Sequence, residues 1–527
     1  MSKTPQESLR TPNKQLKHLH RNTNNNISSS LSLYSPKFSI YLLATCIVLF
    51  ILFRINSLEL PPKPATWSFT EQWQKIIFNN ATATATATTI SATVEQKCST
   101  ATAAPVGTLE NCSCSADKLN AAEKLRRAVT FLPLKDLRYS NTALQGHTWF
   151  MSSMYDDHEE GEVQYQQFPS VSSHGRLLCL KGRDGHDGSW NYYALAWPDT
   201  LPHNATLMKG LTFVSYNHYN YENIWHGLSA AVPFVAWHIK NHCASVPDRW
   251  VLYHWGELRL TMGLWLRTLM EATFDGPPMI EGFNDGVEDE TAPFCFEQAV
   301  VMRHNEGGMR REKRMEVYDL MRCKARVYCN VSTVRVAGDG KVPEIGLTLF
   351  MRVGARSFKN DSAVIGIFGR ECAKVDGCRL TVAHSNNLTF CEQVKLMSST
   401  DILVSPHGAQ LTNMFLLDRN SSVMEFFPKG WLKLAGVGQY VYQWIASWSG
   451  MRHEGAWRDP DGDACPYPED DRRCMSIFKG GRVGYNETYF SEWARKVLTQ
   501  VKMRKIQVKK ASNIGSVDSS SSGCSCT

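Results

Sequence analysis

The sequence predicts an α/β protein in which two domains with parallel sheets face a cleft, preceded by a single transmembrane helix and a stem. Three observations predict this: apolar β-rich runs alternate with helical patterns, a glycine-containing linker separates two such halves, and a charge-free apolar run lies near the start. A chain of 527 residues is also too long for one ordinary core.

Six apolar runs predict strands, and their near-continuous apolar character suits strands buried on both faces of a parallel sheet. A helix is expected between two of them, because Phe390, Val394 and Met397 follow helical spacing. Strand–helix–strand alternation indicates βαβ units. Val336–Val342 is the expected linker, and a cleft between two such halves is a usual nucleotide site. The strand runs are Gly210–Ser215, Arg249–Tyr253, Ile345–Val353, Arg379–Ala383, Asp401–Ser405 and Val423–Phe427.

The charge-free run Phe38–Phe53 predicts a membrane anchor, with Lys37 and Arg54 at its ends. The alternative is a cleaved signal peptide, but the long polar lead and the absence of a small-residue cleavage motif oppose it. Since the basic residues cluster before the run, the N-terminus should be cytosolic and the rest lumenal. The expected order is a cytosolic basic tail (1–37), anchor (38–55), low-complexity lumenal stem (56–140), N-terminal α/β domain on the acceptor side (141–340), C-terminal α/β domain on the nucleotide side (341–500) and a basic, then disordered tail (501–527).

The positive charge is concentrated outside the folded body. The formal charge is +7, with +5 in residues 1–37 and another +5 in Lys502–Lys510, so the remainder is near −3. A nucleic-acid-binding protein would carry its basic excess on the folded body, so that class is disfavoured.

Cysteines and sequons agree with a lumenal body. Ten body cysteines form an even set, which predicts disulfides in an oxidising compartment, and reduced thiols are the alternative. Their spacings give no zinc motif. The cysteines are Cys179, Cys243, Cys295, Cys323, Cys329, Cys372, Cys378, Cys391, Cys465 and Cys474. The expected N-glycosylation sites are Asn80, Asn111, Asn204, Asn330, Asn360, Asn387, Asn420 and Asn486.

The sharpest local motif runs from Pro406 to Asn413 and follows a predicted strand. Gly408 and Ala409 leave room for a ligand to approach the backbone, and a helix beginning near Gln410 would offer unpaired N–H groups. His407 at the strand end could donate to a diphosphate. From local physics alone, a chance strand–turn–helix with a structural histidine is the favoured interpretation.

This motif resembles glycosyltransferase family 61, with plant members the most similar. The stretch DILVSPHGAQLTNMFLLDRNSSVMEFFP (401–428) carries the strand, the His-Gly-Ala-x-Leu-Thr-Asn element and a strand ending in an acidic residue and proline. Upstream, Asn223–His226 matches an Asn-x-x-His turn, Cys295-Phe296 a strand, and Leu349–Arg352 a strand ending in arginine. The resemblance spans about residues 210–430.

The resemblance implies a GT-B type fold of two Rossmann-like domains and an inverting, metal-independent transfer of a sugar from a UDP-sugar to a glycan. Family relatives transfer xylose, arabinose or N-acetylglucosamine to cell-wall or glycoprotein acceptors. It further implies a Golgi enzyme with no cofactor beyond the donor substrate. It leaves open homo- or hetero-oligomers with other Golgi enzymes.

Site residues follow from the same resemblance and from their places on predicted elements. His226 and Glu222 are the candidates for the catalytic base, because the aspartate common in the family four residues after the histidine is Ala230 here. This departure keeps open an inactive member acting as a glycan-binding or scaffolding protein. The expected nucleotide-sugar-binding residues are Arg352, His407, Gly408, Ala409, Thr412 and Glu425.

Three other features have plainer interpretations. The acidic run Asp156–Glu162 is more typical of a solvated loop than of a metal site. The loop Asp459–Asp471 lacks the glutamate of a calcium loop and is expected to be held by Cys465 and Cys474. An aromatic group, more often core than a sugar-binding surface, comprises Trp190, Tyr192, Tyr193, Trp197, Tyr216, Tyr219, Tyr221 and Trp225.

Overall fold

The structure is a computed structural model that describes the body of the chain and the end of its tail. The described residues are 121, 123–134, 160–182, 191–217, 219–254, 256–283, 292–303, 309–333, 342–431, 436–462, 464–468, 472–512 and 524–526. All of them lie in the compact unit Leu109–Thr527. The expected cytosolic tail, anchor, most of the stem and the linker at 336–341 lie outside these ranges. None of the described helices is long and apolar enough to cross a membrane.

The first sheet is mixed. In the described part of the chain it has eight strands in the order β1-β4-β3-β8-β5-β6-β7, with β2 also paired to β8. The central strands β8, β5 and β6 are parallel, and the outer strands pair antiparallel. Its strands are β1 Leu132–Pro133, β2 Gln166–Phe168, β3 Leu177–Lys181, β4 Tyr192–Ala196, β5 Thr206–Asn217, β6 Arg249–His254, β7 Glu257–Arg259 and β8 Phe294–Arg303.

The second sheet is fully parallel. Within the described residues its five strands run β10-β9-β11-β12-β13. They are β9 Ile345–Met351, β10 Cys378–His384, β11 Ile402–Pro406, β12 Ser422–Phe427 and β13 Arg452–Arg458. Strands β11 and β12 are buried along their whole length, as their apolar sequences predict.

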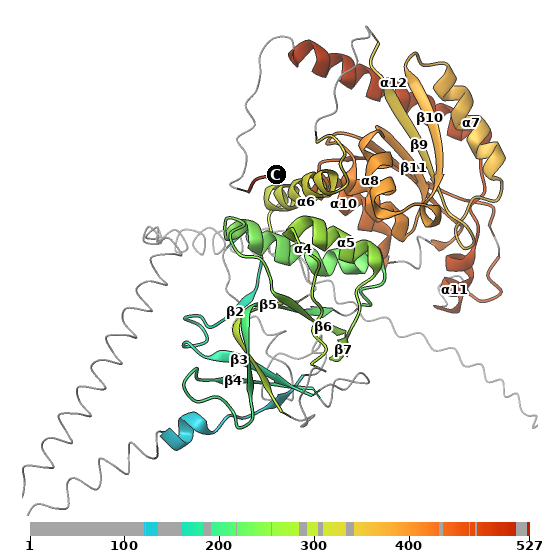
Figure 1. Cartoon of the computed structure of the whole chain (residues 1–527). Coiled ribbons are helices and arrows are strands. Elements are labelled where there is room, and N and C mark those ends of the chain that lie inside the picture. The colour runs from blue at the N-terminus through green and yellow to red at the C-terminus, as the bar shows by residue number, and fades with distance from the viewer. Residues whose placement is uncertain are drawn as a thin grey trace, which may run out of the picture. The chain divides into compact units, whose positions relative to one another are not determined.

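A layer of helices lies between the two sheets (Figure 1). It contains α4 Ile224–Lys240, α5 Leu264–Phe274 and α6 Arg311–Tyr328 on the side of the first sheet. One apolar cluster runs through this layer, joining Phe213 of β5, Val235 of α4 and Phe415 beyond β11. The chain from β5 to β12 therefore shares a continuous core, which fixes the edges of the two sheets relative to each other.

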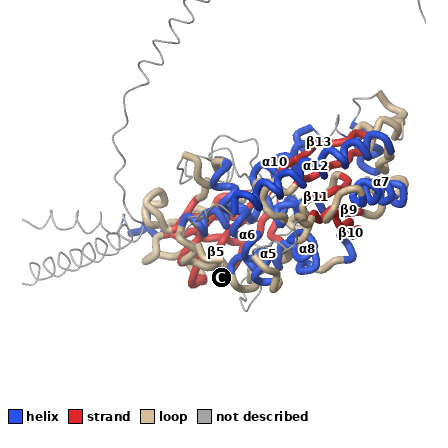
Figure 2. The backbone as a smooth tube through the Cα atoms, turned by 90° about the horizontal axis from the view of Figure 1, so that it is seen from above, coloured by secondary structure: helices blue, strands red, loops and turns tan. Residues whose placement is uncertain are grey.

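The second sheet has helices on both faces (Figure 2). One face packs into the shared core with α8 and α10, and the other forms a separate cluster with α7 and α12. The helices are α7 Asp361–Ala373, α8 Phe390–Ser398, α10 Val441–Ser449, α11 Arg472–Gly480 and α12 Glu487–Ser512, and the 3₁₀ helices are η4 Ser385–Asn387, η5 Ala409–Leu416 and η6 Gly436–Tyr440.

Local sequence explains where the important helices begin. Asn223 caps α4, because its side-chain oxygen accepts from the backbone N–H of Trp225. Thr389 and Glu392 form a capping box at the start of α8. Each cap satisfies a backbone N–H that the first turn of its helix cannot pair itself, so both helix starts are fixed in place.

The six predicted strands and the helix at 390–398 are confirmed, with ends that shift by a few residues. The helix expected near Gln410 begins at Ala409 and is a 3₁₀ helix. Residue 500, where the C-terminal domain was expected to end, lies inside α12. The antiparallel arm of the first sheet was missed, because strands of two to five residues are too short to show a pattern.

All ten body cysteines are in disulfides, as expected, but the set was incomplete. Cys243 and Cys323 pair with Cys524 and Cys526, which lie in the segment that was expected to be a disordered tail. The other bridges are Cys179–Cys295, Cys329–Cys391, Cys372–Cys378 and Cys465–Cys474, the last of which holds the loop at 459–471.

Six of the eight sequon asparagines lie in the described ranges and are exposed: Asn204, Asn330, Asn360, Asn387, Asn420 and Asn486. Asn360 also caps α7 through its side-chain oxygen, which leaves its amide nitrogen for a glycan. Asn80 and Asn111 lie outside the described residues.

Candidate functional site

A pocket of about 490 Å³ opens where the two halves meet. One wall comes from the start of α4 and from α5, and the other from segments that follow β9, β10 and β11 at their carboxyl ends. Ligands of open α/β sheets bind at this edge. The lining residues are Glu222, Asn223, Ile224, Trp265, Arg352, Val353, Arg356, Ser385, Asn386, Gln393, Ala409, Gln410 and Asn413.

Two arginines give the pocket its charge. Arg352 follows β9, and its Nη1 donates to the carbonyl of His407 at 3.3 Å and to Oε1 of Gln410 at 3.2 Å. Arg356 lies four residues on, at a left-handed φ of 61°, with its guanidinium 5.1 Å from the Trp431 ring. The Nε atoms of both are buried and without a hydrogen-bond partner among the described residues.

These guanidiniums are half-buried beside each other. Burial, reinforced by the charge of Arg356, lowers the pKa of Arg352 to about 10, so it stays protonated at neutral pH. Burial also lowers the pKa of Arg356. No carboxylate of the described residues forms an ion pair with either of them. Two neighbouring cations with unused donors are arranged to bind an anion.

The imidazole of His407 lies behind this surface. The residue is 6% exposed, and its ring stacks on Phe427 with centroids 4.6 Å apart and lies edge-on to Tyr442. Its Nδ1 donates to Oε1 of Glu425 at 2.6 Å. The His407 side chain does not line the pocket. Its backbone carbonyl is connected to the pocket by the hydrogen bond that it accepts from Arg352.

Glu425 is enclosed by two histidines. It is 1% exposed, and its second oxygen accepts from Nε2 of His453 on β13 at 2.8 Å. Burial, the largest influence, would raise the pKa of Glu425, but the hydrogen bonds and charges of the two imidazoles outweigh it and the pKa is lowered. Both carboxylate oxygens of Glu425 are therefore used by the two histidines, and Glu425 is not among the residues that line the pocket.

The absence of a side chain at Gly408 lets the Arg352 guanidinium approach the backbone closely. A Cβ on Gly408 would lie 1.9 Å from Nη1 of Arg352 and 2.4 Å from Oε1 of Gln410. Glycine therefore allows this arginine to reach the carbonyl of His407 and the side chain of Gln410. Ala409 lines the pocket, whereas Thr412 is fully buried.

The two candidate bases lie differently. Glu222 is exposed on the pocket wall and accepts from the hydroxyl of Thr261 at 3.1 Å. His226, in the first turn of α4, stacks on Tyr219 and is not part of the lining. Burial, with smaller effects from Lys479 and His254, lowers the pKa of His226 to about 4. Ala230 is 3% exposed in the shared core, so this position faces away from the pocket.

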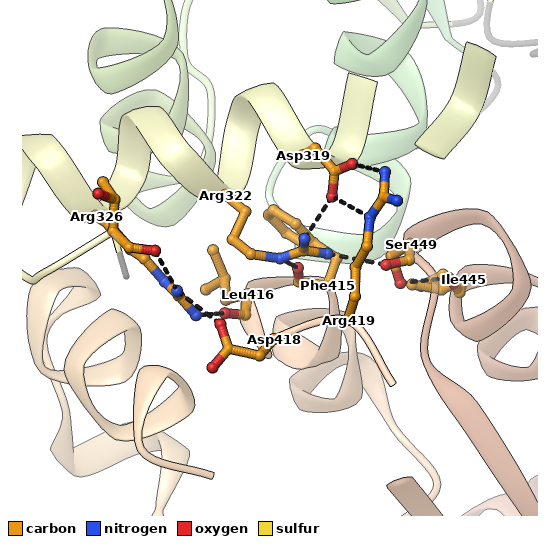
Figure 3. A network of polar contacts seen from close by, with 10 residues as sticks. Asp319, Arg322, Arg326, Phe415, Leu416, Asp418, Arg419, Ile445 and Ser449 are labelled. Carbon is orange, nitrogen blue, oxygen red and sulfur yellow. Dashed lines mark hydrogen bonds and ion pairs between the residues drawn. The ribbon is translucent and has the colours of Figure 1, made fainter. Parts of the chain in front are cut away.

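Two buried arginines of α6 hold the end of η5 through its backbone carbonyls (Figure 3). Arg322 donates to the carbonyls of Phe415 at 2.7 Å and Ser449 at 2.9 Å. Arg326 donates to the carbonyl of Leu416 at 3.1 Å and pairs with Asp418 at 2.7 Å. The carbonyls of Phe415 and Leu416 end η5, and that of Ser449 ends α10. Helix α6 therefore satisfies groups that these helix ends cannot satisfy themselves, and it fixes the element that carries Ala409 and Gln410.

The structure thus brings together Glu222, Arg352 and Ala409 of the predicted residues, with Gly408 adjacent, and leaves His226, His407, Thr412 and Glu425 outside the lining. Sequence reading missed Arg356 and His453. A second cation in the loop after a predicted strand was a usable signal for Arg356. No signal marked His453, because its contact with Glu425 depends on the pairing of β12 with β13.

The other flagged groups have structural roles where they are described. Glu160 and Glu162 of the acidic run pair with Arg310 and Lys313, and its remaining acidic residues lie outside the described ranges. Tyr193, Tyr216 and Tyr221 are core residues. No cluster of three or more potential metal ligands is found across the described ranges.

The two parallel-rich sheets and the pocket at their facing edges are those of a mixed α/β protein compatible with Rossmann-like domains. Residues 219–424 match the family model Glycosyltransferase 61, so the resemblance is confirmed over this part of the chain. The match includes Glu222, His226, Arg352 and the 406–413 motif, and it ends one residue before Glu425. The match supports a glycosyltransferase at the level of the family. A comparison with curated proteins found no match.

Proposed function

We propose that the chain is a GT-B type, inverting glycosyltransferase that transfers a sugar from a UDP-sugar to a glycan without a metal ion. The observation that carries this is the pair Arg352 and Arg356 in the pocket. Both are positively charged, neither pairs with a carboxylate of the described residues, and each has a buried Nε without a partner. Binding of a diphosphate would supply the missing acceptors and offset the cost of burying two cations.

The same pair suits the chemistry of transfer. An acceptor hydroxyl oxygen bonds to the anomeric carbon while the bond from that carbon to the diphosphate breaks, and its electron pair leaves with UDP. Charge therefore grows on the phosphate oxygens, where preorganised guanidinium donors stabilise it. Arg352 is held in place by His407 and Gln410, so little rearrangement is needed when the charge develops.

The hydroxyl proton requires a base within hydrogen-bond reach. We assign this role to Glu222, because it lies on the pocket wall opposite the arginines and is exposed to an incoming acceptor. His226 is the weaker candidate. Its lowered pKa keeps it neutral in a mildly acidic lumen but also makes it a poor proton acceptor, and it lies off the pocket.

We also propose that the protein is a single-pass type II protein of the Golgi membrane, with the catalytic unit in the lumen. The charge-free run 38–53 and the basic tail before it support the orientation. Six disulfides and six exposed sequons in the described body suit an oxidising, glycosylating compartment. Xylose, arabinose and N-acetylglucosamine are the first donor sugars to test, with cell-wall polysaccharides or glycoprotein glycans as acceptors.

A second candidate is a family member that binds a glycan or nucleotide sugar without turnover. The observation in its favour is Ala230, where the family commonly has an aspartate and where this chain places a core methyl group. Tight UDP-sugar binding with no product from any donor would favour this second function.

Calorimetric titration of the full-length chain with UDP and UDP-sugars tests the proposal, alongside transfer assays. Arg352→Ala and Arg356→Ala should each weaken UDP binding about 10- to 150-fold, because each removes charge-assisted hydrogen bonds. Arg379→Ala is the matched control, since Arg379 lies on the same sheet, exposed and paired with Glu344. If UDP binds the wild type and both pocket variants equally, the phosphate assignment is wrong.

A further inference from the structure

The second arginine of the pocket, Arg356, lies against an aromatic ring. Arg352 donates to the carbonyl of His407 and to the side chain of Gln410. The Nε of Arg356, by contrast, is buried and has no hydrogen-bond partner among the described residues. Its guanidinium carbon lies 5.1 Å from the centroid of the Trp431 ring. An indole face attracts a cation without taking up its N–H donors in hydrogen bonds, so this contact leaves them for a ligand.

The Trp431 ring is itself fixed in place. It is 7% exposed, and its centroid lies 5.6 Å from that of the His407 ring. Gly430 comes directly before it at a φ of 71°, a left-handed conformation that favours glycine. A Cβ on Gly430 would lie 2.4 Å from the Phe478 ring of α11, so this ring approaches the backbone closely. The position of the indole is therefore set by His407 and by α11.

The backbone of Arg356 is held by a segment that follows α11. Its φ of 61° is left-handed, which a residue other than glycine adopts only where its surroundings impose it. Its N–H donates to the carbonyl of Gly481 at 2.9 Å, and the N–H of Val483 donates to the carbonyl of Ser357 at 2.8 Å. Arg482 also donates from Nε to Oγ of Ser357 at 3.2 Å. The loop that carries Arg356 is therefore fixed, and what remains is the direction of its long side chain.

Trp431 can influence a ligand only through its neighbours, because it is not among the residues that line the pocket. It also lies beyond residue 424, where the family match ends, so the match gives it no role. A long arginine side chain loses rotamer entropy when a ligand fixes it. A ring that restrains the guanidinium before the ligand arrives reduces this loss and so strengthens binding without touching the ligand.

We infer that Trp431 is a positioning residue, which holds the Arg356 guanidinium in place for the diphosphate of the donor. This inference rests on the proposed function, since it concerns the same anion site. Because Trp431 acts through Arg356, its contribution to binding disappears when Arg356 is removed. A tryptophan that only fills space would contribute the same amount with or without the arginine.

Calorimetric titration of the full-length chain with UDP and with inorganic pyrophosphate tests the inference. Trp431→Leu should weaken binding of both about 2- to 30-fold, because it removes the aromatic face, and Trp431→Phe should recover most of the affinity. Trp431→Leu should cause no further loss in a chain that already carries Arg356→Ala. Trp457→Leu is the matched control and should leave UDP affinity unchanged, because Trp457 is also 7% exposed and lies in the separate cluster beside α7 and α12.

Three results would overturn the inference: a Leu variant that binds both ligands like the wild type, a Phe variant that binds no better than the Leu variant, and an equal loss with and without Arg356. Pyrophosphate separates the inference from the proposed function. If pyrophosphate binds with the expected dependence on both residues but UDP does not bind, the positioning role stands and the donor assignment fails. If neither ligand binds, both fail. Trp431→Met also lacks an aromatic face, and it replaces Trp431→Leu if that variant shows no cooperative thermal transition.

Discussion

His453→Leu removes one of the two donors to the buried carboxylate of Glu425. In the folded protein, Oε2 of Glu425 accepts from His453 at 2.8 Å and the residue is 1% exposed, so no water replaces the lost donor. A hydrogen bond to a charged group contributes roughly 1.5–3 kcal/mol. The free energy of unfolding should fall by about this amount at pH 7.

The pH dependence gives the prediction its direction. The two imidazoles hold the pKa of Glu425 below its usual range, so its ionised form stabilises the fold above the ordinary carboxyl pKa, and this stability is lost as pH falls through the lowered value. Without His453 the folded pKa rises. The deficit should be full at pH 7 and should narrow as pH falls through the variant's higher pKa, because the variant's carboxyl protonates first. It should vanish only once pH has also passed the wild type's lowered value, where both proteins carry a protonated carboxyl.

Urea unfolding of the wild type and variants across this pH range measures the effect. His453→Gln keeps an N–H donor without a titrating ring and should recover most of the stability. His203→Leu is a control at an exposed histidine. Equal losses for the Leu and Gln variants, or a deficit that does not vary with pH, would show that His453 only fills space.

Three further predictions concern the site and its supports. Gly408→Val should weaken UDP binding with little loss of stability, because its side chain would displace the flexible end of Arg352; an unchanged UDP titration would contradict this close approach. Arg322→Met should lower the free energy of unfolding by about 2–5 kcal/mol, because it leaves the carbonyls of Phe415 and Ser449 unpaired and Asp319 with one partner fewer. Urea denaturation measures this loss, and a change of less than about 0.5 kcal/mol would contradict it. Transfer activity should persist in excess chelator, and a complete loss that manganese restores would reveal a metal step.

Sequence could predict the second half of the molecule better than the first. Strands β9, β11 and β12 are continuous apolar runs, because a parallel sheet covered on both faces leaves no polar side, and that pattern is visible locally. The arm β1–β4 has strands stabilised by their neighbours in the sheet, so their short sequences carry little information.

Some residues of the site could likewise be predicted from the sequence, and others could not. Arg352 and Gly408 could be found because they adjoin strand ends, where parallel sheets collect their functional groups. The placement of His407 could not be predicted. Whether a histidine at a strand end faces a ligand or a buried carboxylate depends on Glu425, Phe427 and Tyr442, which come from other segments.

The bridges from Cys524 and Cys526 bring the chain's end back to α4 and α6, across sequence separations of 281 and 203 residues. Both partners, Cys243 and Cys323, precede the second sheet, so their thiols stay unpaired until everything through residue 526 has been made. A chain cut or fused between α12 and Cys524 could fold both sheets yet retain two reactive cysteines on the first half. Unpaired thiolates of this kind can take part in disulfide exchange.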